Sequence, residues 1–340
     1  MKEYKIAIIG GHGLVAITLL KLLCNSFYKD SDITLFGTKN SEVTIGERSF
    51  NIVKIDEDSI EHYDVVFMCC SNEISEKYTP FFIKHGAKVI DNSSLYRLEK
   101  DVPLAICEVN PYDLLMNTNI FCNPNCVAIM LALALKPLYD AYKIEKIITS
   151  TYQSVSGAGK EALNQLAKEN IGLDCDKVLP NSKSIKKNIY NNIIPVVDEI
   201  DFETSYSKEE IKIIKEIKKI FHDDTIDVIA TCVRIPTRIG HGASVYVTFK
   251  NKVDIKYVEK LFMENAYIKY FKDLDYPTFD DVKNTTKIGI GRLRKDPNCD
   301  YSLAFFVTSD NLIRGAAYNS LSIFYKLIEF KIIWQLQNFQ

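Results

Sequence analysis

The chain has 340 residues, of which 47% are hydrophobic and 25% charged, and its net charge is −2. This composition is that of a protein with a substantial buried core, and the length suits about two domains of ~100–200 residues each. A near-neutral charge without a dominant basic stretch argues against nucleic acid as a partner. No apolar run approaches the ~20 residues that a membrane-spanning helix needs, so no membrane partner is expected.

Cysteine usage and the start of the chain predict a cytoplasmic protein. The nine cysteines are odd in number and scattered, which is not the pattern of a disulfide framework. Residues 1–5 run directly into a strand-like segment rather than a secretory signal. Cys69 and Cys70 have no companion ligands at metal-binding spacing, so we predict no metal site.

The first elements have the pattern of a dinucleotide-binding βαβ unit. An apolar run at residues 6–9 leads into a glycine-rich turn and then a helical pattern, with Ala16 where a third glycine is common. Such a turn places the pyrophosphate of a dinucleotide at the N-terminus of the helix. His12 is unusual there, and it either caps the helix or contacts the cofactor. The predicted cofactor-binding residues of this segment are Gly10, His12, Gly13, Leu14 and Val15.

The end of the second predicted strand, residues 33–36, indicates which cofactor binds. An Asp or Glu at this point favours NAD, but the sequence continues Gly37-Thr38-Lys39 and has no acid before Glu42. A hydroxyl beside a cation suits the 2′-phosphate of NADP, with a hydrogen bond from Thr38 and charge from Lys39. We therefore predict NADP, with NAD as the alternative. Further buried parallel strands are expected at residues 64–70 and 88–91.

Cys126 stands at the start of an apolar helical run, residues 127–135. Pro124 biases Asn123 toward extended backbone, so the helix is expected to begin at or just after Asn125, and it is expected to end at Lys136-Pro137. Cys126 then lies in the first turn, where free N–H groups and the helix dipole stabilise a thiolate and can hold an oxyanion. The alternative is a small hydrophobic residue of the core.

Beyond residue 142 the pattern changes to that of an α+β domain. Strand-like segments at 144–153, 226–236 and 243–250 are separated by long excursions, one of which contains a charged helix at 208–221. A helical pattern at 315–334 is expected to pack back on the first domain. The predicted fold is α/β: a Rossmann-type NADP-binding domain at 1–126, completed by a C-terminal helix within 316–340, and an α+β catalytic and dimerisation domain at 127–315.

Several segments together resemble the aspartate-semialdehyde dehydrogenase family in order and spacing. They span nearly the whole chain, at residues 90–97, 108–111, 123–126, 150–159, 234–236, 240–241, 309–312 and 314–317. The resemblance implies an oxidoreductase that interconverts L-aspartate 4-semialdehyde and L-4-aspartyl phosphate, using NADP and inorganic phosphate. It implies a cysteine acyl-thioester, a place in lysine, threonine and methionine biosynthesis, and a homodimer or a tetramer built from dimers.

The resemblance also implies the catalytic roles. Cys126 is the nucleophile, His241 the acid/base, and Gln153 orients the acyl intermediate. The chemistry calls for such groups, since a thiolate both attacks an acyl carbon and leaves it readily. A neutral imidazole can take the thiol proton or the proton of a hemithioacetal, depending on direction.

Anion and cofactor binding are assigned in the same way. The resemblance implies that Arg234 holds the α-carboxylate of the substrate, and that Arg97 and Lys212 bind phosphate. Glu209 helps to shape that site and contacts the substrate amine; its spacing from Lys212 places both on one helix face. Further cofactor contacts are implied for Ser156, Gly157 and Asn311.

Each of these residues also has an ordinary interpretation. His241 alone suits a structural or surface histidine, Arg97 a surface ion pair, Glu209 with Lys212 a helix ion pair, and Gln153 a group that satisfies backbone at a strand end. The joint pattern favours the functional interpretation. The remaining alternatives are another acyl-phosphate or acyl-CoA reductase, and a catalytically weak paralogue with a binding role. The glycine turn and the Cys69-Cys70 segment both depart from the family pattern, and both fall in the cofactor half.

Overall fold

The computed structural model describes residues 4–28, 32–58, 60–179 and 186–333, and the chain divides into two compact units. The first comprises Met1–Pro124 and Ala316–Gln340, the second Asn125–Gly315. The division follows Pro124 rather than the expected position after residue 126, so that Cys126 belongs to the second unit. Residues 1–3 of the N-terminal segment, and residues 334–340 of the expected C-terminal helix region, lie outside the described residues.

The first unit is built on a seven-stranded sheet of order β3-β4-β2-β1-β5-β6-β7, in which only the pairing of β3 is antiparallel. Its strands are β1 (Lys5–Ile9), β2 (Asp32–Gly37), β3 (Ser41–Ile45), β4 (Arg48–Lys54), β5 (Val65–Met68), β6 (Lys88–Asp91) and β7 (Ile120–Cys122). Its helices are α1 (Leu14–Cys24), α2 (Asn72–Lys84), the 3₁₀ turn η1 (Pro111–Leu115) and α7 (Tyr318–Glu329). Strand β1 lies where the chain order reverses, which is where doubly wound sheets bind ligands.

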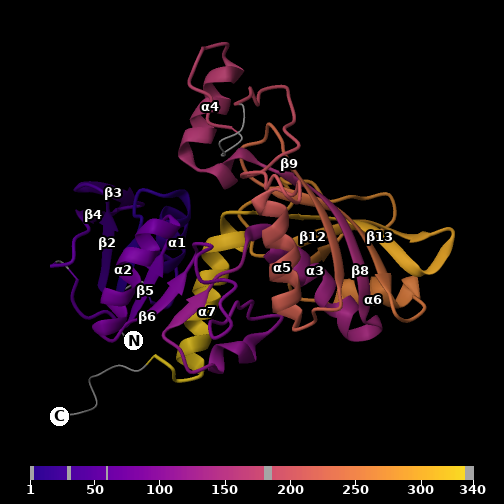
Figure 1. The fold of residues 1–340 in the computed structure, drawn as a ribbon, viewed down its shortest axis with the longest axis horizontal. Coiled ribbons are helices and arrows are strands. Elements are labelled where there is room, and N and C mark those ends of the chain that lie inside the picture. Colours follow the sequence, from indigo (N-terminus) through magenta and orange to yellow (C-terminus); the bar gives the residue numbers. More distant parts are fainter. Residues whose placement is uncertain (1–3, 29–31, 59, 180–185, 334–340) are drawn as a thin grey trace. The chain divides into compact units, whose positions relative to one another are not determined.

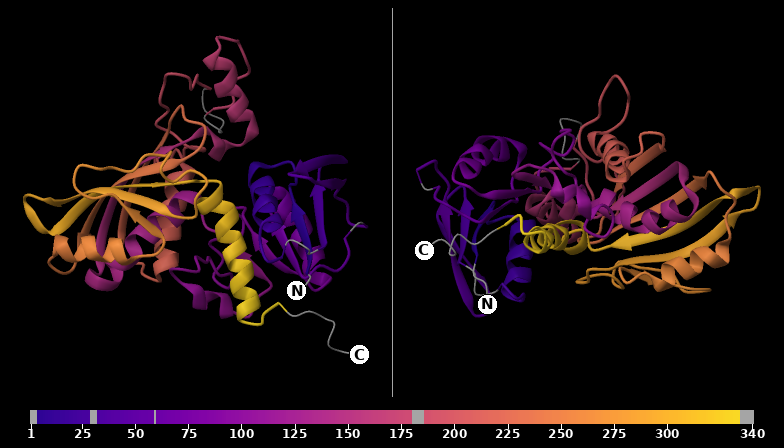
Figure 2. Two further views of the ribbon diagram at one scale, coloured as in Figure 1. Left: turned by 180° about the vertical axis from the view of Figure 1, so that it is seen from behind. Right: turned by 90° about the horizontal axis from the view of Figure 1, so that it is seen from below.

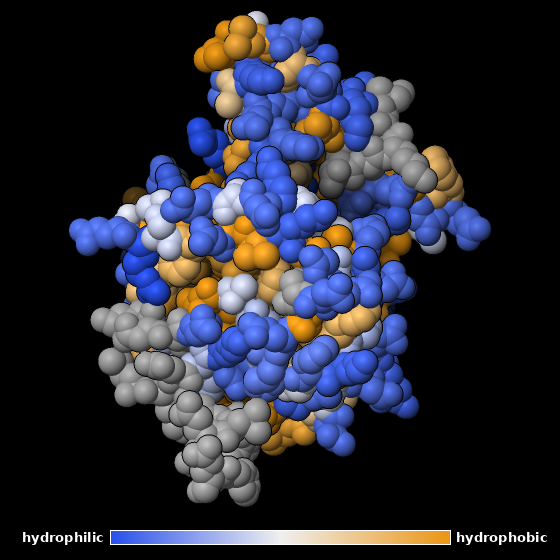
Figure 3. Space-filling view, turned by 90° about the vertical axis from the view of Figure 1, so that its left-hand side faces the viewer, coloured by the Kyte–Doolittle hydropathy of each residue, from blue (hydrophilic) through white to orange (hydrophobic). Residues whose placement is uncertain are grey.

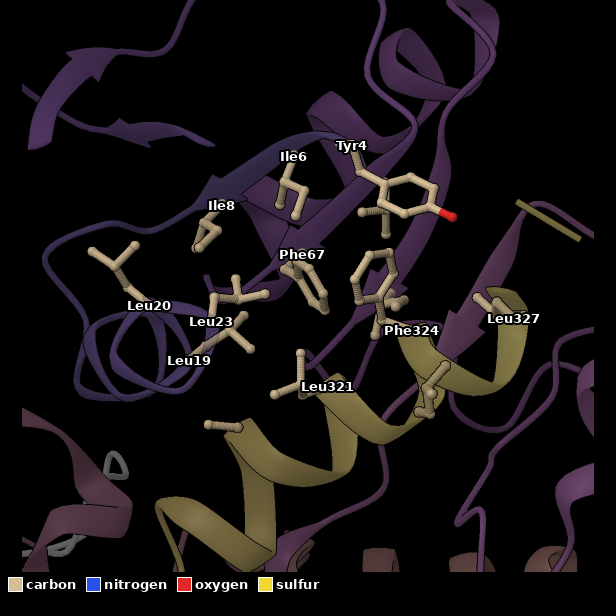
Figure 4. Close-up of a cluster of buried hydrophobic side chains, with 14 of the residues drawn as sticks. Tyr4, Ile6, Ile8, Leu19, Leu20, Leu23, Phe67, Leu321, Phe324 and Leu327 are labelled. Atoms are coloured by element: carbon tan, nitrogen blue, oxygen red, sulfur yellow. The ribbon is translucent and has the colours of Figure 1, made fainter. Parts of the chain in front are cut away.

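Helices cover both faces of the central strands, which explains their continuous apolar sequence. Alternate residues of β1 point to opposite faces: Ile6 and Ile8 join the core under α1 and α7, whereas Ala7 and Ile9 join the core under α2. In Figure 4 side chains from β1, α1, β5 and α7 converge in one cluster. Phe324 of α7 makes edge-on ring contacts there with Tyr4 and Phe67, at centroid distances of 5.5 and 5.9 Å.

These contacts confirm that the C-terminal helix completes the first unit. Helix α7 begins after the π-helical turn η3 (Ile313–Ala317) and ends at Glu329, so it is shorter than the pattern at 315–334 predicted. Each fully buried Leu, Ile or Phe contributes about 1.5–3 kcal/mol, so the buried face of α7 anchors it firmly. In Figure 2 this helix is the yellow element beside the indigo and purple strands of the unit.

The second unit contains a six-stranded mixed sheet of order β11-β12-β13-β10-β8-β9, as the predicted α+β domain requires. Its strands are β8 (Ile144–Gln153), β9 (Asp227–Arg234), β10 (His241–Phe249), β11 (Ile268–Tyr270), β12 (Ile288–Asp296) and β13 (Cys299–Ser309). Its helices are α3 (Cys126–Tyr142), the 3₁₀ turn η2 (Val155–Ala158), α4 (Lys160–Asn170), α5 (Lys208–Phe221) and α6 (Ile255–Glu264).

One face of this sheet is covered by helices, and in the part of the chain that the structure describes the other face, called the open face below, carries exposed side chains. Helix α3 contacts β8, β12 and β13, with α5 beside it over β9 and α6 beside it over β11 and β12 (Figures 1 and 2). Along β8 and β9 residues alternate between buried and exposed. Large apolar side chains are exposed on the open face at Ile148, Tyr152 and Ile229.

Some helix boundaries are determined by the local sequence, and others by the packing of the helix against the rest of the unit. Helix α5 spans the predicted residues 208–221, and Ser207 with Glu210 forms a reciprocal capping box at its start. Helix α3 begins after Asn125 as predicted, but the expected end at Lys136-Pro137 is wrong. The helix continues through Pro137 to Tyr142, because Leu138 and Tyr142 are buried and this packing outweighs the cost of a proline in the interior.

Charged and polar residues cover much of the surface that Figure 3 shows. On the face shown in Figure 3 hydrophilic residues predominate, and hydrophobic residues show in patches between them. Of the helices that the structure describes, none combines the length and apolar character needed to cross a membrane. Within the described ranges, no group of three or more His, Cys, Asp and Glu side chains is arranged to hold a metal ion.

Candidate active site

The glycine turn after β1 has the geometry of a phosphate-binding loop. The N–H groups of Gly10 and Gly11 both donate to the carbonyl of Phe36, at 2.9 and 2.8 Å, and the N–H of Gly13 donates to Gly10 at 2.7 Å. Gly10 has φ +85, and a Cβ there would lie 2.3 Å from the carbonyl oxygen of Cys69. Gly13 is the N-cap of α1, whose first turn carries no acidic residue. Leu14 and Val15 follow in that first turn, where free N–H groups attract a phosphate.

His12 does not cap the helix. The N-cap position belongs to Gly13 and has no side-chain hydrogen bond, while His12 Nε2 lies 2.6 Å from Ser41 Oγ on β3. The ring also covers Gly37 at the end of β2, where a Cβ would be 2.8 Å from His12 Nδ1. Thr38 and Lys39 follow Gly37 and are exposed. His12 therefore lies beside the residues predicted to bind the 2′-phosphate, which leaves the cofactor contact as its expected role.

Replacing Gly10 tests whether this turn needs a glycine. Gly10→Ala is expected to lower the free energy of unfolding by at least twice as much as Gly46→Ala, and to weaken dinucleotide binding at least tenfold. Both positions have positive φ, which costs an L-residue about 1–2 kcal/mol, but a Cβ at Gly46 meets nothing within 4 Å. Urea unfolding and a nucleotide titration measure the two effects. Equal losses in both variants would show that the contact with Cys69 is unimportant.

In the second unit, strand register brings three predicted residues into one row. Gln153 ends β8, and it pairs with Arg234 on parallel β9 and with His241 on antiparallel β10. Residues at one level of adjacent strands point to the same face, and here all three side chains are buried. Residues that are 81 and 88 positions from Gln153 in sequence thus become its neighbours.

The peptide groups of Ser154, immediately after β8, hold two of these side chains. Its N–H donates to His241 Nδ1 at 3.1 Å, and its carbonyl accepts a hydrogen bond from Arg234 Nη1 at 2.7 Å. Burial, and then the charge of Arg234, lower the pKa of His241 to about 3. Burial also lowers the pKa of Arg234, and this is partly offset by Glu209 and by a thiolate at Cys126. The pKa of Arg234 therefore depends on the charge of Cys126.

Asn125 fixes the start of the helix that carries Cys126. Its side-chain oxygen accepts hydrogen bonds from the N–H groups of Val127 and Ala128, at 2.9 and 3.3 Å. Cys126 itself is half-buried in the first position of α3. Gly315 approaches it closely, since a Cβ there would lie 2.7 Å from Cys126 Cβ. Cys126 is more exposed than its neighbours along α3, which favours the nucleophile over the core interpretation.

Two carboxylates of α5 hold Asn125 in turn. Glu216, which is 1% exposed, accepts from the backbone N–H of Asn125 at 2.6 Å. Glu209 accepts from the side-chain amide of Asn125 at 2.9 Å and from that of Gln153 at 3.3 Å. The amide of Gln153 therefore bonds to side chains rather than to backbone. The helix start at Asn125 was predicted from the sequence, but the contact of Glu216 with Asn125 was not.

Lys212 has two acidic neighbours. Its ammonium lies 3.6 Å from Glu209, as the helix spacing predicts, and 2.6 Å from Asp198, which the sequence did not indicate. Lys212 is a quarter exposed and Glu209 is buried, so the pair is more than a solvated helix ion pair.

Removing the cap of α3 is expected to disturb both stability and the site. Asn125→Ala is expected to lower the free energy of unfolding by about 1–2 kcal/mol, because an N-cap is lost and the buried Glu209 loses a donor. Asn125→Ser is the matched control, since serine keeps a capping oxygen. Thermal or urea unfolding measures both variants. A Ser variant as unstable as the Ala variant would indicate that capping is not the cause.

The residues predicted to line the cofactor form a buried polar group next to His241. The Asn311 amide donates to Ser156 Oγ at 2.9 Å, and its oxygen accepts from the N–H of Gly240 at 2.9 Å. The backbone of Gly157 lies close to the site, since a Cβ there would be 3.0 Å from Arg234 Nη1 and 3.2 Å from His241 Nε2. Only glycine keeps that approach clear.

Arg97, the remaining predicted residue, belongs to the first unit. It is 8% exposed and donates to the carbonyl of Asn92 at 2.8 Å, in the loop after β6. This burial does not suit the interpretation of Arg97 as a surface ion pair. The other predicted anion-binding residues lie in the second unit.

Comparison with known proteins agrees with this architecture. Residues 5–116 match the family model "Semialdehyde dehydrogenase, NAD binding domain", and residues 135–314 match "Semialdehyde dehydrogenase, dimerisation domain". The aspartate-semialdehyde dehydrogenase of Shewanella violacea is 36% identical to this chain, and the match covers 95% of this chain and 97% of that protein. The aspartate-semialdehyde dehydrogenase of Aquifex aeolicus is 34% identical, and the match covers 94% of this chain and 96% of that protein. The chain belongs to the aspartate-semialdehyde dehydrogenase family. The predicted family, and with it an oxidoreductase, is thereby confirmed.

Solved structures of the aspartate-semialdehyde dehydrogenase family confirm the predicted fold class. The crystal structure of aspartate semialdehyde dehydrogenase II from Vibrio cholerae, complexed with ASA, matches this structure with a TM-score of 0.89, and its sequence is 31% identical to this chain. The match covers 97% of this chain and 99% of that one. The NAD-binding match also confirms a nucleotide-binding domain at the N-terminal end.

Proposed function

We propose that this chain interconverts L-aspartate 4-semialdehyde and L-4-aspartyl phosphate, using inorganic phosphate and NADP. Support comes from relatives named aspartate-semialdehyde dehydrogenase that match nearly the whole chain, and from the Vibrio cholerae relative complexed with ASA. The observation that carries the proposal is that Glu209 joins the helix start before Cys126 to Gln153, which pairs with Arg234 and His241 on the neighbouring strands. This combination provides a nucleophile, an anion clamp and a proton-handling group.

Cys126 is the proposed nucleophile. Its sulfur attacks the acyl carbon, phosphate leaves, and the product is a thioester that is then reduced to the semialdehyde; the reverse reaction runs through the same thioester. The helix N-terminus and Arg234 favour the thiolate electrostatically. Gln153 orients the acyl group, and its amide is held by Glu209. His241 handles the proton on the reacting oxygen.

Arg234 is proposed to bind the α-carboxylate of the substrate. A guanidinium pairs bidentately with a planar carboxylate, and this one has lost most of its water through burial. Glu209 suits the substrate amine because it is a buried acceptor. Phosphate binding by Arg97 and Lys212 rests on the family resemblance.

The residues present fit a nicotinamide dinucleotide. At Gly10, Gly13 and Gly157 a Cβ would crowd neighbouring atoms, and such glycines allow a ligand to approach the backbone closely. When bound, NADP takes up or supplies the hydride. Leu14 and Val15 would lie beside the pyrophosphate, His12, Thr38 and Lys39 would face the 2′-phosphate, and Ser156, Gly157 and Asn311 would contact the nicotinamide half.

Lys39 tests the preference for NADP. Lys39→Ala is expected to raise the Kd for NADP about tenfold and to leave the Kd for NAD nearly unchanged, because only NADP carries the charge that Lys39 pairs with. Titrations of the intact protein with both nucleotides measure this, and Lys54→Ala, an exposed lysine on β4, is the matched control. Equal losses for both nucleotides would remove Lys39 from the 2′-phosphate site.

The open face of the second sheet supports the proposed homodimer or tetramer. Ile148, Tyr152 and Ile229 are exposed together on it, and such a face suits a second copy of the chain. The matched family model is a dimerisation domain. We also propose a cytoplasmic enzyme of lysine, threonine and methionine biosynthesis, in line with the absence of disulfide-type cysteine spacing.

The proposed function is tested by nucleotide reduction with L-aspartate 4-semialdehyde. Turnover is expected with NADP and phosphate. Little turnover is expected when NAD replaces NADP, and much less turnover when coenzyme A replaces phosphate. Faster turnover with coenzyme A would identify an acyl-CoA reductase. No turnover with any combination would favour a paralogue with a binding role.

A further inference from the structure

The start of helix α3 is closed by a side chain from another helix. In a capping box, the N-cap side chain accepts from the first turn, and a glutamate three residues later accepts from the N-cap N–H. Helix α5 has this arrangement within itself, between Ser207 and Glu210. In α3 the position of that glutamate is Ala128, and the N–H of Asn125 donates instead to Glu216 of α5, at 2.6 Å. The two helices lie side by side (Figure 1).

Helix α5 holds Asn125 by both its backbone and its side chain. Glu216 accepts from the backbone N–H, and Glu209, seven residues earlier on α5, accepts from the side-chain amide at 2.9 Å. Residues seven apart lie on the same helix face. Glu209 also accepts from Gln153 at 3.3 Å, so α5 connects the start of α3 to the row of buried side chains at the end of β8. All of these residues belong to the second unit.

The burial of Glu216 is costly, and the fold does not require it. Glu216 is 1% exposed and shares the buried face of α5 with three isoleucines, Ile213, Ile217 and Ile220. A carboxylate in such a place loses its water, whereas an apolar side chain would fill the same space without that cost. The N–H of Asn125 could be satisfied from within α3, as the capping box of α5 satisfies its own N-cap. The use of a second helix therefore points to a purpose beyond closing α3.

Activation of the thiol is not that purpose. The Glu216 carboxylate bonds to the peptide that precedes Cys126, and it adds a negative charge beside the start of α3. A like charge nearby disfavours a thiolate. What the contact supplies is position, because the peptide at the N-cap determines where α3 begins and therefore where its first side chain, Cys126, is carried.

We propose that Glu216 is a positioning residue for Cys126, and that its carboxylate fixes the N-cap peptide so that the sulfur is aligned for attack on the acyl carbon. The proposal rests on the function proposed above and deepens it, since Glu216 acts through Asn125 and touches no substrate. Alignment of a nucleophile has a large effect on rate, because a misplacement of about 1 Å can cost about 100-fold.

The burst of NADPH tests this when the protein is mixed with NADP and the semialdehyde without phosphate. Its rate constant reports alignment, and its amplitude counts the intact sites. Glu216→Leu is expected to lower the rate constant about 30- to 100-fold, and Glu216→Gln, which keeps an acceptor oxygen, to remain at least about fivefold faster than the Leu variant. The amplitude is expected to stay equal to the protein concentration in both. An unchanged rate constant in the Leu variant, or a lower amplitude at an unchanged rate constant, would overturn the proposal.

Glu210→Leu is the matched control on the same helix. Glu210 is also buried, and it accepts from the N-cap N–H of Ser207 at 2.7 Å. Its loss is expected to lower the midpoint of urea unfolding about as much as Glu216→Leu does, and to leave the burst rate constant close to that of wild type. A Glu210 variant as slow as the Glu216 variant would show that the loss of any capping carboxylate is sufficient, and it would overturn the positioning role.

Alkylation of Cys126 separates position from ionisation. Iodoacetamide reacts with the thiolate and needs no alignment with the rest of the site. Its rate, followed on the peptide that contains Cys126, is expected to be no slower in Glu216→Leu and Glu216→Gln than in wild type. Alkylation that slows in proportion to the burst would show that Glu216 supports the thiolate, and it would overturn the proposal.

The wild-type protein distinguishes this failure from failure of the proposed function. A wild type without a burst would refute the proposed function and this proposal with it. A wild type with a full burst, beside Glu216 variants that react as fast, would refute only the positioning role.

Discussion

Cys126→Ala is expected to abolish phosphate-dependent NADP reduction by the semialdehyde, with a loss of about 10⁴-fold or more. Without the sulfur there is no thioester, and neither Gln153 nor His241 has an intermediate to act on. The fold is expected to persist, because Cys126 is half-buried and α3 remains capped by Asn125. Steady-state kinetics measure the loss, and urea unfolding checks that the free energy of unfolding changes by no more than about 1 kcal/mol.

Cys122→Ala is the matched control for that loss. Cys122 lies four residues before Cys126 in the sequence but is fully buried at the end of β7. Its removal is expected to cost a little stability and to leave kcat within a factor of a few. Substantial turnover by Cys126→Ala would refute the covalent mechanism, whatever the control shows.

Arg234→Lys is expected to raise the KM for the semialdehyde about 10- to 100-fold although the charge is kept. The guanidinium uses Nη1 to hold the carbonyl of Ser154 and still presents a flat edge to a carboxylate, which an ammonium cannot do. Arg294→Lys, at an exposed position of the same sheet, controls for the change of residue type. An unchanged KM in Arg234→Lys would remove this residue from substrate binding.

The parts of the fold that the sequence predicted are those decided by neighbours along the chain. The strand, turn and helix at residues 5–24 follow from local apolar pattern and glycines, and the start of α3 follows from Pro124 and a capping Asn125. The β3–β4 hairpin was missed, although residues 41–54 alternate around Gly46, because its strands are short and carry charged residues. The course of α3 past Pro137 depends on burial, which the local sequence does not express.

The resemblance to the family predicted which residues form the site, but it did not predict how they are arranged. That Arg234, Gln153 and His241 share one row depends on strand register, which is set by pairings over long sequence separations. The supporting contacts of Ser154 and Glu216 were missed because one acts through its peptide groups and the other is one glutamate among many. Only the folded chain shows that the peptide groups of Ser154 hold both His241 and Arg234.

The central claim is that Cys126 carries the acyl group, and trapping that thioester tests it most directly. The protein is mixed with NADP and the semialdehyde without phosphate, and its mass is measured at once. The account predicts an aspartyl adduct on the peptide that contains Cys126, formed with a burst of NADPH equal to the protein concentration and removed by added phosphate. A burst of NADPH without an adduct at Cys126, or with the adduct on another cysteine, would contradict it.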